Sequence, residues 1–450
     1  MTIHGRTAYR GSPPVGGAST GRYYVALPVR PSTDDDAARL AEPPPIAHER
    51  RRRARELAVA LGRRLAELSV EPPAYGLASG YSGLALAFDE LARCDPDGPW
   101  RGLAGRALRG AVEAIPAHAG PGMLDGLAGV AFCAARLATA AARPLPLLER
   151  LDAMLVDAGP GLLAPLAGAE PLPGGSWDHM AGVTGLGAYL LGRREREQTR
   201  ALLASVLDAL AARAQAAPDL SGYRALPEAE RPARIDAGLS HGVAGPLALL
   251  SLAAREGIEV AGQREAVAEL GGWLVARASA DAAGPRWPSW LALADDGVCA
   301  EQPGLDPRPA WCYGSGGIAW ALWNAGDCLQ EAGWRAAALD GLERALDLDP
   351  AERRLPSPTL CHGVAGTLQI TMRLAQRTGS AELWARADAL AGELLAAFDT
   401  SSPYGIRDID PNGATADRPG LLTGAAGVVL TLCTVGSSDA SGWDRVLLLS

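Results

Sequence analysis

The stretch SHGVAGPLALL, residues 240–250, contains the pattern that decides the fold. It consists of Gly-x-x-Gly followed by an apolar run, and nearly the same letters return as CHGVAG at residues 361–366. The motif occurs seven times, with first glycines at Gly80, Gly126, Gly182, Gly242, Gly314, Gly363 and Gly424. Successive copies are separated by 46 residues (Gly80 to Gly126) to 72 residues (Gly242 to Gly314), enough for two helices and a loop. A repeat of this length predicts an array of similar helical units.

Two kinds of helical pattern alternate along the chain. Amphipathic, arginine-bearing segments are predicted at 55–68, 100–115, 146–157, 195–215, 263–280, 333–347 and 381–398. A nearly all-apolar segment follows each glycine motif. A helix with one polar face belongs on the outside of a fold, and an apolar helix belongs inside. We therefore predict an all-α fold, an α/α toroid of seven outer and seven inner helices built from seven repeats, whose closure removes exposed end repeats.

Other segments are assigned by composition. Residues 1–45 are rich in Gly, Pro, Ser and Asp and are interpreted as a flexible N-terminal arm, whereas residues 46–450 are predicted to form a single toroid domain. Residues 286–294 (RWPSWLALA) are a candidate strand of a hairpin. The glycines of the motif are expected to supply unusual backbone dihedrals and to permit close approach of neighbouring inner helices.

The bulk composition of the 450 residues excludes several classes of function. The net charge of -9 argues against nucleic acid as a partner. All 42 basic residues are arginine, which excludes a phosphate-binding Walker loop and lysine Schiff-base chemistry. The seven cysteines form no dense framework, as in proteins of a reducing cytosol. Without an apolar stretch of about 18 residues, no membrane insertion is expected, and we predict a cytoplasmic protein, with peripheral attachment to a membrane-associated complex left open.

Cysteine and histidine occupy matching positions in consecutive copies of the motif. Cys312 and Cys361 lie two residues before the first glycine of their copies, and His241 and His362 lie one residue before. If the copies are equivalent around one axis, these side chains converge at one end of the ring. Zinc prefers thiolate and imidazole ligands, so Cys312, Cys361 and His362 are predicted to hold one Zn2+ with an open fourth position. Cys94, Cys133, Cys328 and Cys433 lie inside predicted helices and are assigned to packing.

Four further residues are candidates for catalysis. His241 follows a serine where the sixth copy has a cysteine, so it is interpreted as an acid/base group beside the metal. Asp178, in the neighbouring copy, is a candidate to orient His241, to bind substrate or to take part in proton transfer, and Arg308 is a candidate to stabilise an enolate or a peptide carbonyl. Tyr313 flanks Cys312 and is a candidate to line the pocket. His4, His48, His118 and His179 are given no role.

These motifs resemble the lanthipeptide (lantibiotic) cyclases, the LanC-like family. The resemblance rests on WCYGSGG at 311–317, CHGVAG at 361–366, SHGVAGPLALL at 240–250 and Asp178 ahead of GVTGLGAYLL, and it covers roughly residues 50–435. It implies an α/α toroid with zinc on the residues that match Cys312, Cys361 and His362. It also implies catalytic roles for His241, Asp178 and Arg308.

The resemblance further implies the reaction and the partners. A cyclase of this family adds a peptide cysteine thiol to a dehydroalanine or dehydrobutyrine and closes a lanthionine or methyllanthionine ring. The substrate would be a dehydrated precursor peptide, and a stand-alone cyclase would work beside a separate dehydratase and a transporter. Two alternatives remain open: another zinc-thiolate alkyltransferase, such as a prenyltransferase-like enzyme, or a non-catalytic LanC-like protein that binds thiols or acts as a scaffold.

Overall fold

The computed structural model describes residues 46–67, 74–142, 145–167, 172, 175–216, 220, 223, 234–281, 284–293, 306–437 and 441–450. The predicted N-terminal arm, residues 1–45, lies outside these residues. The described part contains fifteen α-helices and six short strands. None of its helices combines the length and the apolar character needed to cross a bilayer.

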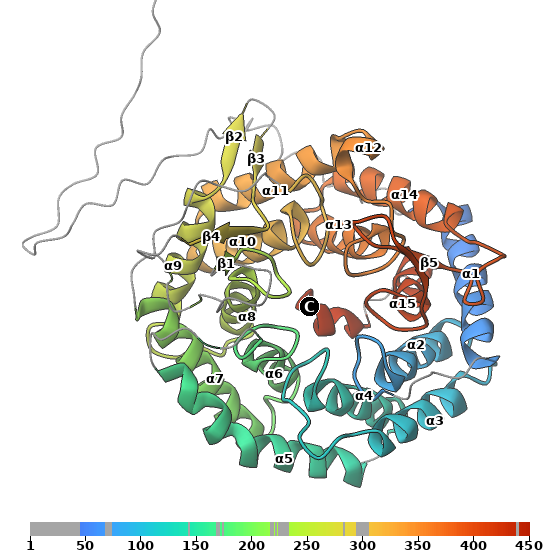
Figure 1. Cartoon of the computed structure of the whole chain (residues 1–450), viewed down its shortest axis with the longest axis horizontal. Coiled ribbons are helices and arrows are strands. Elements are labelled where there is room, and N and C mark those ends of the chain that lie inside the picture. The colour runs from blue at the N-terminus through green and yellow to red at the C-terminus, as the bar shows by residue number, and fades with distance from the viewer. Residues whose placement is uncertain are drawn as a thin grey trace, which may run out of the picture.

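Fourteen of the helices form two concentric rings (Figure 1). The outer ring consists of α1 (His48–Glu67), α3 (Trp100–Glu113), α5 (Pro146–Leu163), α7 (Glu197–Gln215), α9 (Gln263–Ala276), α11 (Ala332–Asp347) and α14 (Ala381–Ala396). The inner ring consists of α2 (Tyr81–Cys94), α4 (Leu127–Ala140), α6 (Val183–Leu191), α8 (Ala244–Arg255), α10 (Ser315–Leu329), α13 (Val364–Thr378) and α15 (Ala425–Gly436). The short helix α12 (Pro350–Arg353) lies between α11 and α13 in the chain. The predicted toroid of seven outer and seven inner helices is confirmed.

The two rings differ in burial as the polarity of their sequences predicts. Residues 244–253 of the inner helix α8 are all buried, whereas the longer outer helix α1 buries only one stripe, formed by Ala54, Ala58, Leu61, Gly62 and Leu65. Each inner helix packs against the outer helix that follows it in sequence, and the last inner helix, α15, packs against α1. The inner helix α15 also contacts α2, so the ring closes between the two ends of the repeat array (Figure 1).

A closed belt of backbone hydrogen bonds joins the seven glycine loops. Its members are the residues two positions before each first glycine, or their direct neighbours. The N–H to O distances are 3.0 Å for Ala78 to Leu124, 3.0 Å for Leu124 to Met180, 3.2 Å for His179 to Ser240, 3.5 Å for Ser240 to Cys312, 3.1 Å for Cys312 to Cys361, 2.8 Å for Cys361 to Leu422 and 3.1 Å for Leu422 to Ala78. The belt satisfies loop backbone groups that would otherwise be orphaned, and it holds equivalent residues of neighbouring copies side by side.

The motif glycines are needed for space more than for unusual dihedrals. Of the seven first glycines only Gly314 has a positive φ, +84°, and the other six lie outside the left-handed region of backbone conformation. A Cβ on the second glycine of the sixth copy, Gly366, would overlap the carbonyl oxygen of Leu360 and crowd Trp311. The expectation of close approach is therefore confirmed, and the expectation of unusual dihedrals is wrong except at Gly314.

Three two-stranded antiparallel sheets lie in the loops. β1 (Arg234–Asp236) pairs with β4 (Trp290–Ala292), β2 (Ser279–Asp281) with β3 (Gly284–Arg286), and β5 (Arg407–Ile409) with β6 (Thr415–Asp417). The strand predicted at 286–294 is thus two strands with different partners, and Ala294 lies outside the described residues. The hairpin of β5 and β6 was not predicted.

Residues 441–450 occupy the middle of the ring (Figure 1). They include the 3-10 helix η4 (Trp443–Leu447), whose Asp444 is buried and paired with Arg373. Three consecutive carbonyl oxygens then bond to side chains of the ring. Val446 O lies 2.8 Å from Nε2 of His179, Leu447 O 2.9 Å from Nε1 of Trp311 and Leu448 O 2.6 Å from Nε1 of Trp320. This segment therefore supports the glycine loops from inside the ring.

Candidate functional site

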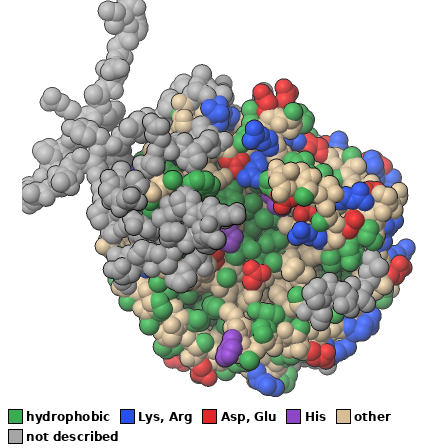
Figure 2. Space-filling view, viewed as in Figure 1, with side chains coloured by type: hydrophobic (Ala, Val, Ile, Leu, Met, Phe, Trp, Pro, Cys, Tyr) green, Lys and Arg blue, Asp and Glu red, His purple; other side chains and the backbone are tan. Residues whose placement is uncertain are grey.

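The residues immediately before the first glycines face one end of the ring. They are Ser79, Asp125, Ala181, His241, Tyr313, His362 and Thr423, and all are exposed or half-buried although the glycines that follow them are buried. Each precedes the N-terminus of an inner helix, so the belt places them around one opening. Figure 2 shows histidine, acidic and basic side chains close together near the centre of this face.

The two predicted cysteine ligands are neighbours. Cys312 N–H donates to the carbonyl of Cys361 over 3.1 Å, and the two free thiols share a hydrogen bond. That bond lowers the pKa of the Cys312 thiol, aided by the positive charges of Arg308 and His362, and raises the pKa of Cys361 well above its usual value. The pair therefore has one sulfur prepared to lose its proton.

His362 lies beside an aspartate that the sequence analysis missed. Its Nε2 is buried and lies 3.2 Å from Oδ1 of Asp408 on β5, without a well-aligned hydrogen bond. Asp408 is 3% exposed and accepts hydrogen bonds from Ser357 and Thr359. Burial lowers the pKa of His362, but the nearby charges of Asp408 and Cys312 raise it by more, so the net shift is upward. A carboxylate beside an imidazole is the usual outer partner of a metal-binding histidine.

Arg308 lies near the thiols and is held by a second aspartate. Its Nε lies 2.9 Å from Oδ1 of Asp306 and its Nη2 lies 2.6 Å from Oδ2, so Nη1 takes no part in these bonds. The hydrogen bonds with Asp306 and the charges of Cys312 and Cys361 raise the pKa of the guanidinium, which stays charged. A cavity of about 1030 Å³ opens beside Arg308, with Trp290, Pro307, Pro350, Pro356 and Pro411 in its wall.

His241 and Asp178 form a hydrogen-bonded pair. His241 Nδ1 lies 2.6 Å from Asp178 Oδ2, and the aspartate is 1% exposed whereas the imidazole is 45% exposed. Nε2 of His241 is thus the nitrogen left for a substrate. Asp178 is the main cause of the raised pKa of His241, and the charge of Cys312 adds to it, so the thiol is close enough to act on the imidazole. This arrangement is that of an oriented general acid/base.

Three neighbours of the pair complete the rim. Tyr313 is half-buried, and its ring lies against Gly238, where a Cβ would meet it. Asp125 was not singled out from the sequence; burial and the negative charge of Asp178 raise its pKa. His179 points away from the rim to Val446, is fully buried, and burial lowers its pKa to about 4.

Of the four cysteines assigned to packing, Cys94 and Cys433 contact each other. Cys94 Sγ lies 3.9 Å from the carbonyl oxygen of Cys433, and a hydrogen bond between the two thiols lowers the pKa of Cys94. Cys94 ends the inner helix α2 and Cys433 lies near the C-terminal end of α15, so both are at the opposite end of their helices from the glycine loops.

The chemistry of the donors fits zinc. Two adjacent thiols, one with a lowered pKa, and an imidazole whose Nε2 faces a carboxylate, which leaves Nδ1 for a metal, are ligands of the kinds that zinc prefers. Within the described residues, however, no three or more His, Cys, Asp or Glu side chains are already arranged as a metal cage. Metal binding by Cys312, Cys361 and His362 would therefore need side-chain adjustment on a backbone that already places them together.

Comparison with known proteins identifies the relatives of this architecture. Residues 71–448 match the family described as "Lanthionine synthetase C-like protein". Among solved structures, "Nisin cyclase" superposes with a TM-score of 0.71 at 18% sequence identity, covering 90% of this chain and 98% of that chain. An unsaturated glucuronyl hydrolase from Streptococcus agalactiae superposes with a TM-score of 0.46 at 8% identity, covering 88% and 98%. No curated protein matches the sequence.

Proposed function

The chain belongs to the lanthionine synthetase C-like family, and we propose that it is a zinc-dependent lanthipeptide cyclase. Its reaction would be the Michael addition of a peptide cysteine thiol to dehydroalanine or dehydrobutyrine, which forms a lanthionine or methyllanthionine ring. The observation that carries the proposal is the meeting of the Cys312–Cys361 thiol pair, His362 and the Asp178–His241 pair at one end of the toroid.

Cys312, Cys361 and His362 would hold one zinc ion per chain. A bound zinc ion supplies Lewis acidity, under which a coordinating thiol loses its proton near neutral pH. Asp408, 3.2 Å from Nε2 of His362, would fix the orientation of the imidazole and raise its basicity.

His241 would move the proton. Asp178 accepts from Nδ1, so neutral His241 presents an unprotonated Nε2 that takes the proton of the substrate thiol. As the new C–S bond forms at the β-carbon of the alkene, the π electrons move onto the α-carbon and its carbonyl oxygen. Nε2 then returns the proton to the α-carbon, so that the ring forms without net gain or loss of atoms.

Arg308 and its cavity would hold the substrate. A guanidinium with Nη1 outside its pair with Asp306 can donate to the carbonyl oxygen on which enolate charge develops. The cavity of about 1030 Å³ beside it is large enough for several peptide residues, and its prolines and Trp290 offer a rigid apolar wall. Tyr313, the residue after Cys312, would line the pocket at the thiols.

The fold similarity to nisin cyclase supports a peptide substrate. We propose a precursor peptide whose serines and threonines have been dehydrated by a separate dehydratase, with a transporter as a further partner. The reaction would take place in the cytoplasm, free or in a peripheral complex at the membrane.

The test uses the purified full chain, zinc analysis and a synthetic peptide with one dehydroalanine and one cysteine. Cyclisation leaves the mass unchanged, so the free thiol is counted by alkylation followed by mass spectrometry. We expect about one zinc per chain and a loss of alkylatable thiol that depends on the protein. If the thiol remains alkylatable while zinc is bound, a thiol-binding or scaffold function replaces the cyclase. Consumption of an added isoprenoid diphosphate would instead indicate an alkyltransferase.

A further inference from the structure

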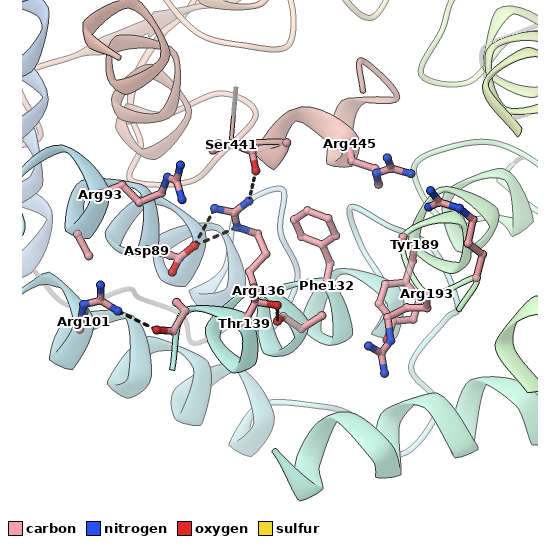
Figure 3. A pocket seen from close by; sticks show the side chains of 16 residues that line it. Asp89, Arg93, Arg101, Phe132, Arg136, Thr139, Tyr189, Arg193, Ser441 and Arg445 are labelled. Atoms are coloured by element: carbon pink, nitrogen blue, oxygen red, sulfur yellow. Dashed lines mark hydrogen bonds and ion pairs between the residues drawn. The ribbon is translucent and has the colours of Figure 1, made fainter. Parts of the chain in front are cut away.

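A second cavity lies at the end of the inner helices opposite to the glycine loops. Figure 3 shows the side chains that line it. Its volume is about 570 Å³, within the range of small-molecule sites. Its walls come from the C-terminal ends of α2, α4 and α6, from α3 and from residues 441–445. The α2 residues of the lining begin at Asp89, eight residues after the helix starts at Tyr81, so at ~1.5 Å per residue the cavity begins about 12 Å along the helix axis from the level of the glycine loops.

Arginine dominates the lining of this cavity. Six guanidinium groups line it, those of Arg93, Arg101, Arg136, Arg193, Arg194 and Arg445, against one lining carboxylate, Asp89. Among the described residues, three more carboxylates pair with these arginines from just outside the lining, namely Glu90, Asp152 and Glu256. Six positive groups against four negative ones leave an excess of two positive charges.

Part of this arginine cluster is structural. Arg136 lies 2.9 Å from Asp89, 2.7 Å from the carbonyl of Ser441 and also contacts Glu90, so its donors are used (Figure 3). Glu256 is shared by Arg194 at 2.8 Å and Arg445 at 3.0 Å. These contacts fix the walls of the cavity and tie residues 441–445 to the ring.

Not every donor of the cluster has a protein acceptor among the described residues. Nη1 of Arg445 and Nε of Arg193 are buried without a hydrogen-bond partner among the described residues. Arg93 approaches Glu90 only at 3.8 Å and is half-exposed, and Arg101 donates from Nη1 to the carbonyl of Ala140 over 3.2 Å. The exposed guanidinium groups of Arg93 and Arg101 therefore keep donors that a ligand oxyanion in the cavity can reach.

We propose that this cavity binds a small organic dianion through its phosphate or carboxylate oxygens. Guanidinium groups bind both kinds of oxyanion in paired geometry, and the excess of two positive charges matches a dianion. Phe132 and Tyr189 in the wall provide an apolar surface for the organic part of the ligand. The thiol addition proposed above needs no such ligand, so failure of one proposal would leave the other unaffected.

Isothermal titration calorimetry on the full chain tests this site, with inorganic phosphate and malonate as probes at constant ionic strength. We expect one probe or both to bind at one site per chain and to raise the unfolding temperature. Binding of phosphate alone identifies a phosphate ligand, and binding of malonate alone identifies a dicarboxylate. Absence of saturable binding by both would overturn the proposal.

The double variant Arg93→Gln/Arg101→Gln removes two exposed donors from the cavity and leaves the ion pairs of Arg136, Arg193, Arg194 and Arg445 in place. We expect it to weaken binding about tenfold or more. The matched control Arg52→Gln/Arg264→Gln removes two exposed arginines from the outer helices α1 and α9, with the same change in net charge. Equal weakening in both double variants would show a non-specific charge effect and would also overturn the proposal. Thermal unfolding without ligand verifies that each variant is folded.

Discussion

Oδ2 of Asp178 lies 2.6 Å from Nδ1 of His241, although 63 residues separate them and they precede different inner helices. The other carboxylate oxygen of Asp178 accepts hydrogen bonds from the backbone N–H groups of Ala181 at 2.8 Å and Gly182 at 3.1 Å. Burial lowers the pKa of His241, but the hydrogen bond and the charge of Asp178 raise it by more, so the pKa lies above its ordinary value of 6.5. Asp178 thus sets both the orientation of the imidazole and the pH at which Nε2 is free to accept a proton.

Asp178→Asn is expected to move the acid limb of the pH profile of kcat/KM to lower pH. The limb reports deprotonation of His241 in the free enzyme, and loss of the carboxylate charge removes the cause of its raised pKa. The measurement is the rate of thiol loss from the dehydroalanine peptide over a pH series. Asp125→Asn is the matched comparison, because this rim carboxylate acts on His241 by its charge and not through a hydrogen bond, and it should move the limb less. An unchanged limb in Asp178→Asn would remove His241 from proton transfer.

His241→Ala is expected to lower kcat/KM about 100-fold or more, since a positioned general acid/base typically contributes at least that factor. The imidazole is 45% exposed, so the variant should fold with little change in stability. Zinc content should remain that of the wild type, which separates a catalytic loss from a loss of metal. Cyclisation at the wild-type rate would contradict the role proposed for His241.

Cys312→Ala and Cys361→Ala are each expected to reduce zinc content from about one ion per chain to a small fraction, because a site with two remaining protein ligands binds zinc weakly. Metal analysis after gel filtration in metal-free buffer measures this directly. Cys328→Ala serves as the control, as this half-buried thiol lies near the C-terminal end of α10 and its burial raises its pKa. Stoichiometric zinc in either ligand variant would refute the proposed ligand set.

The repeat made most of the fold predictable. Six inner helices begin at the residue directly after the first glycine of the motif, and α8 begins two residues after it, at Ala244. The matching positions of Cys312 and Cys361 likewise predicted that the two thiols would be neighbours, because residues at one register of a closed ring must lie around one opening. The backbone belt is the physical cause of that agreement.

The features that were missed do not follow the repeat. Asp408 belongs to the β5–β6 hairpin inserted before the last inner helix, and its approach to His362 depends on how that loop folds back. The entry of residues 441–450 into the ring has no periodic signal either. The position of residues 441–450 explains the orientation of His179, a residue that was given no role. Its side chain bonds to Val446 inside the ring, whereas its neighbour Asp178 faces His241.

Asp408→Asn is expected to weaken zinc affinity by 10- to 100-fold, the usual effect of losing the carboxylate beside a metal-binding histidine. The amide keeps the size of the side chain but lacks the charge that raises the pKa of His362. Competition with a chromophoric chelator gives the affinity without any assay of activity. Asp417→Asn on the facing strand β6 is the matched control, because its exposed carboxylate pairs with Arg407 and not with His362. Equal affinities in the two variants would show that Asp408 serves only the hairpin.

Trp311→Phe is expected to destabilise the protein by about 2 kcal/mol more than Trp273→Phe does, because it leaves the buried carbonyl of Leu447 without its donor. Both tryptophans are buried, but Nε1 of Trp273 has no hydrogen-bond partner among the described residues, so its replacement costs packing and part of the contact between Arg277 and the ring but leaves no carbonyl without its donor. Urea unfolding followed by circular dichroism compares the two variants. Since Trp311 directly precedes Cys312, loosening of residues 441–450 should also weaken zinc affinity in Trp311→Phe and not in Trp273→Phe. Equal stabilities would mean that the ring holds its glycine loops without the segment at its centre.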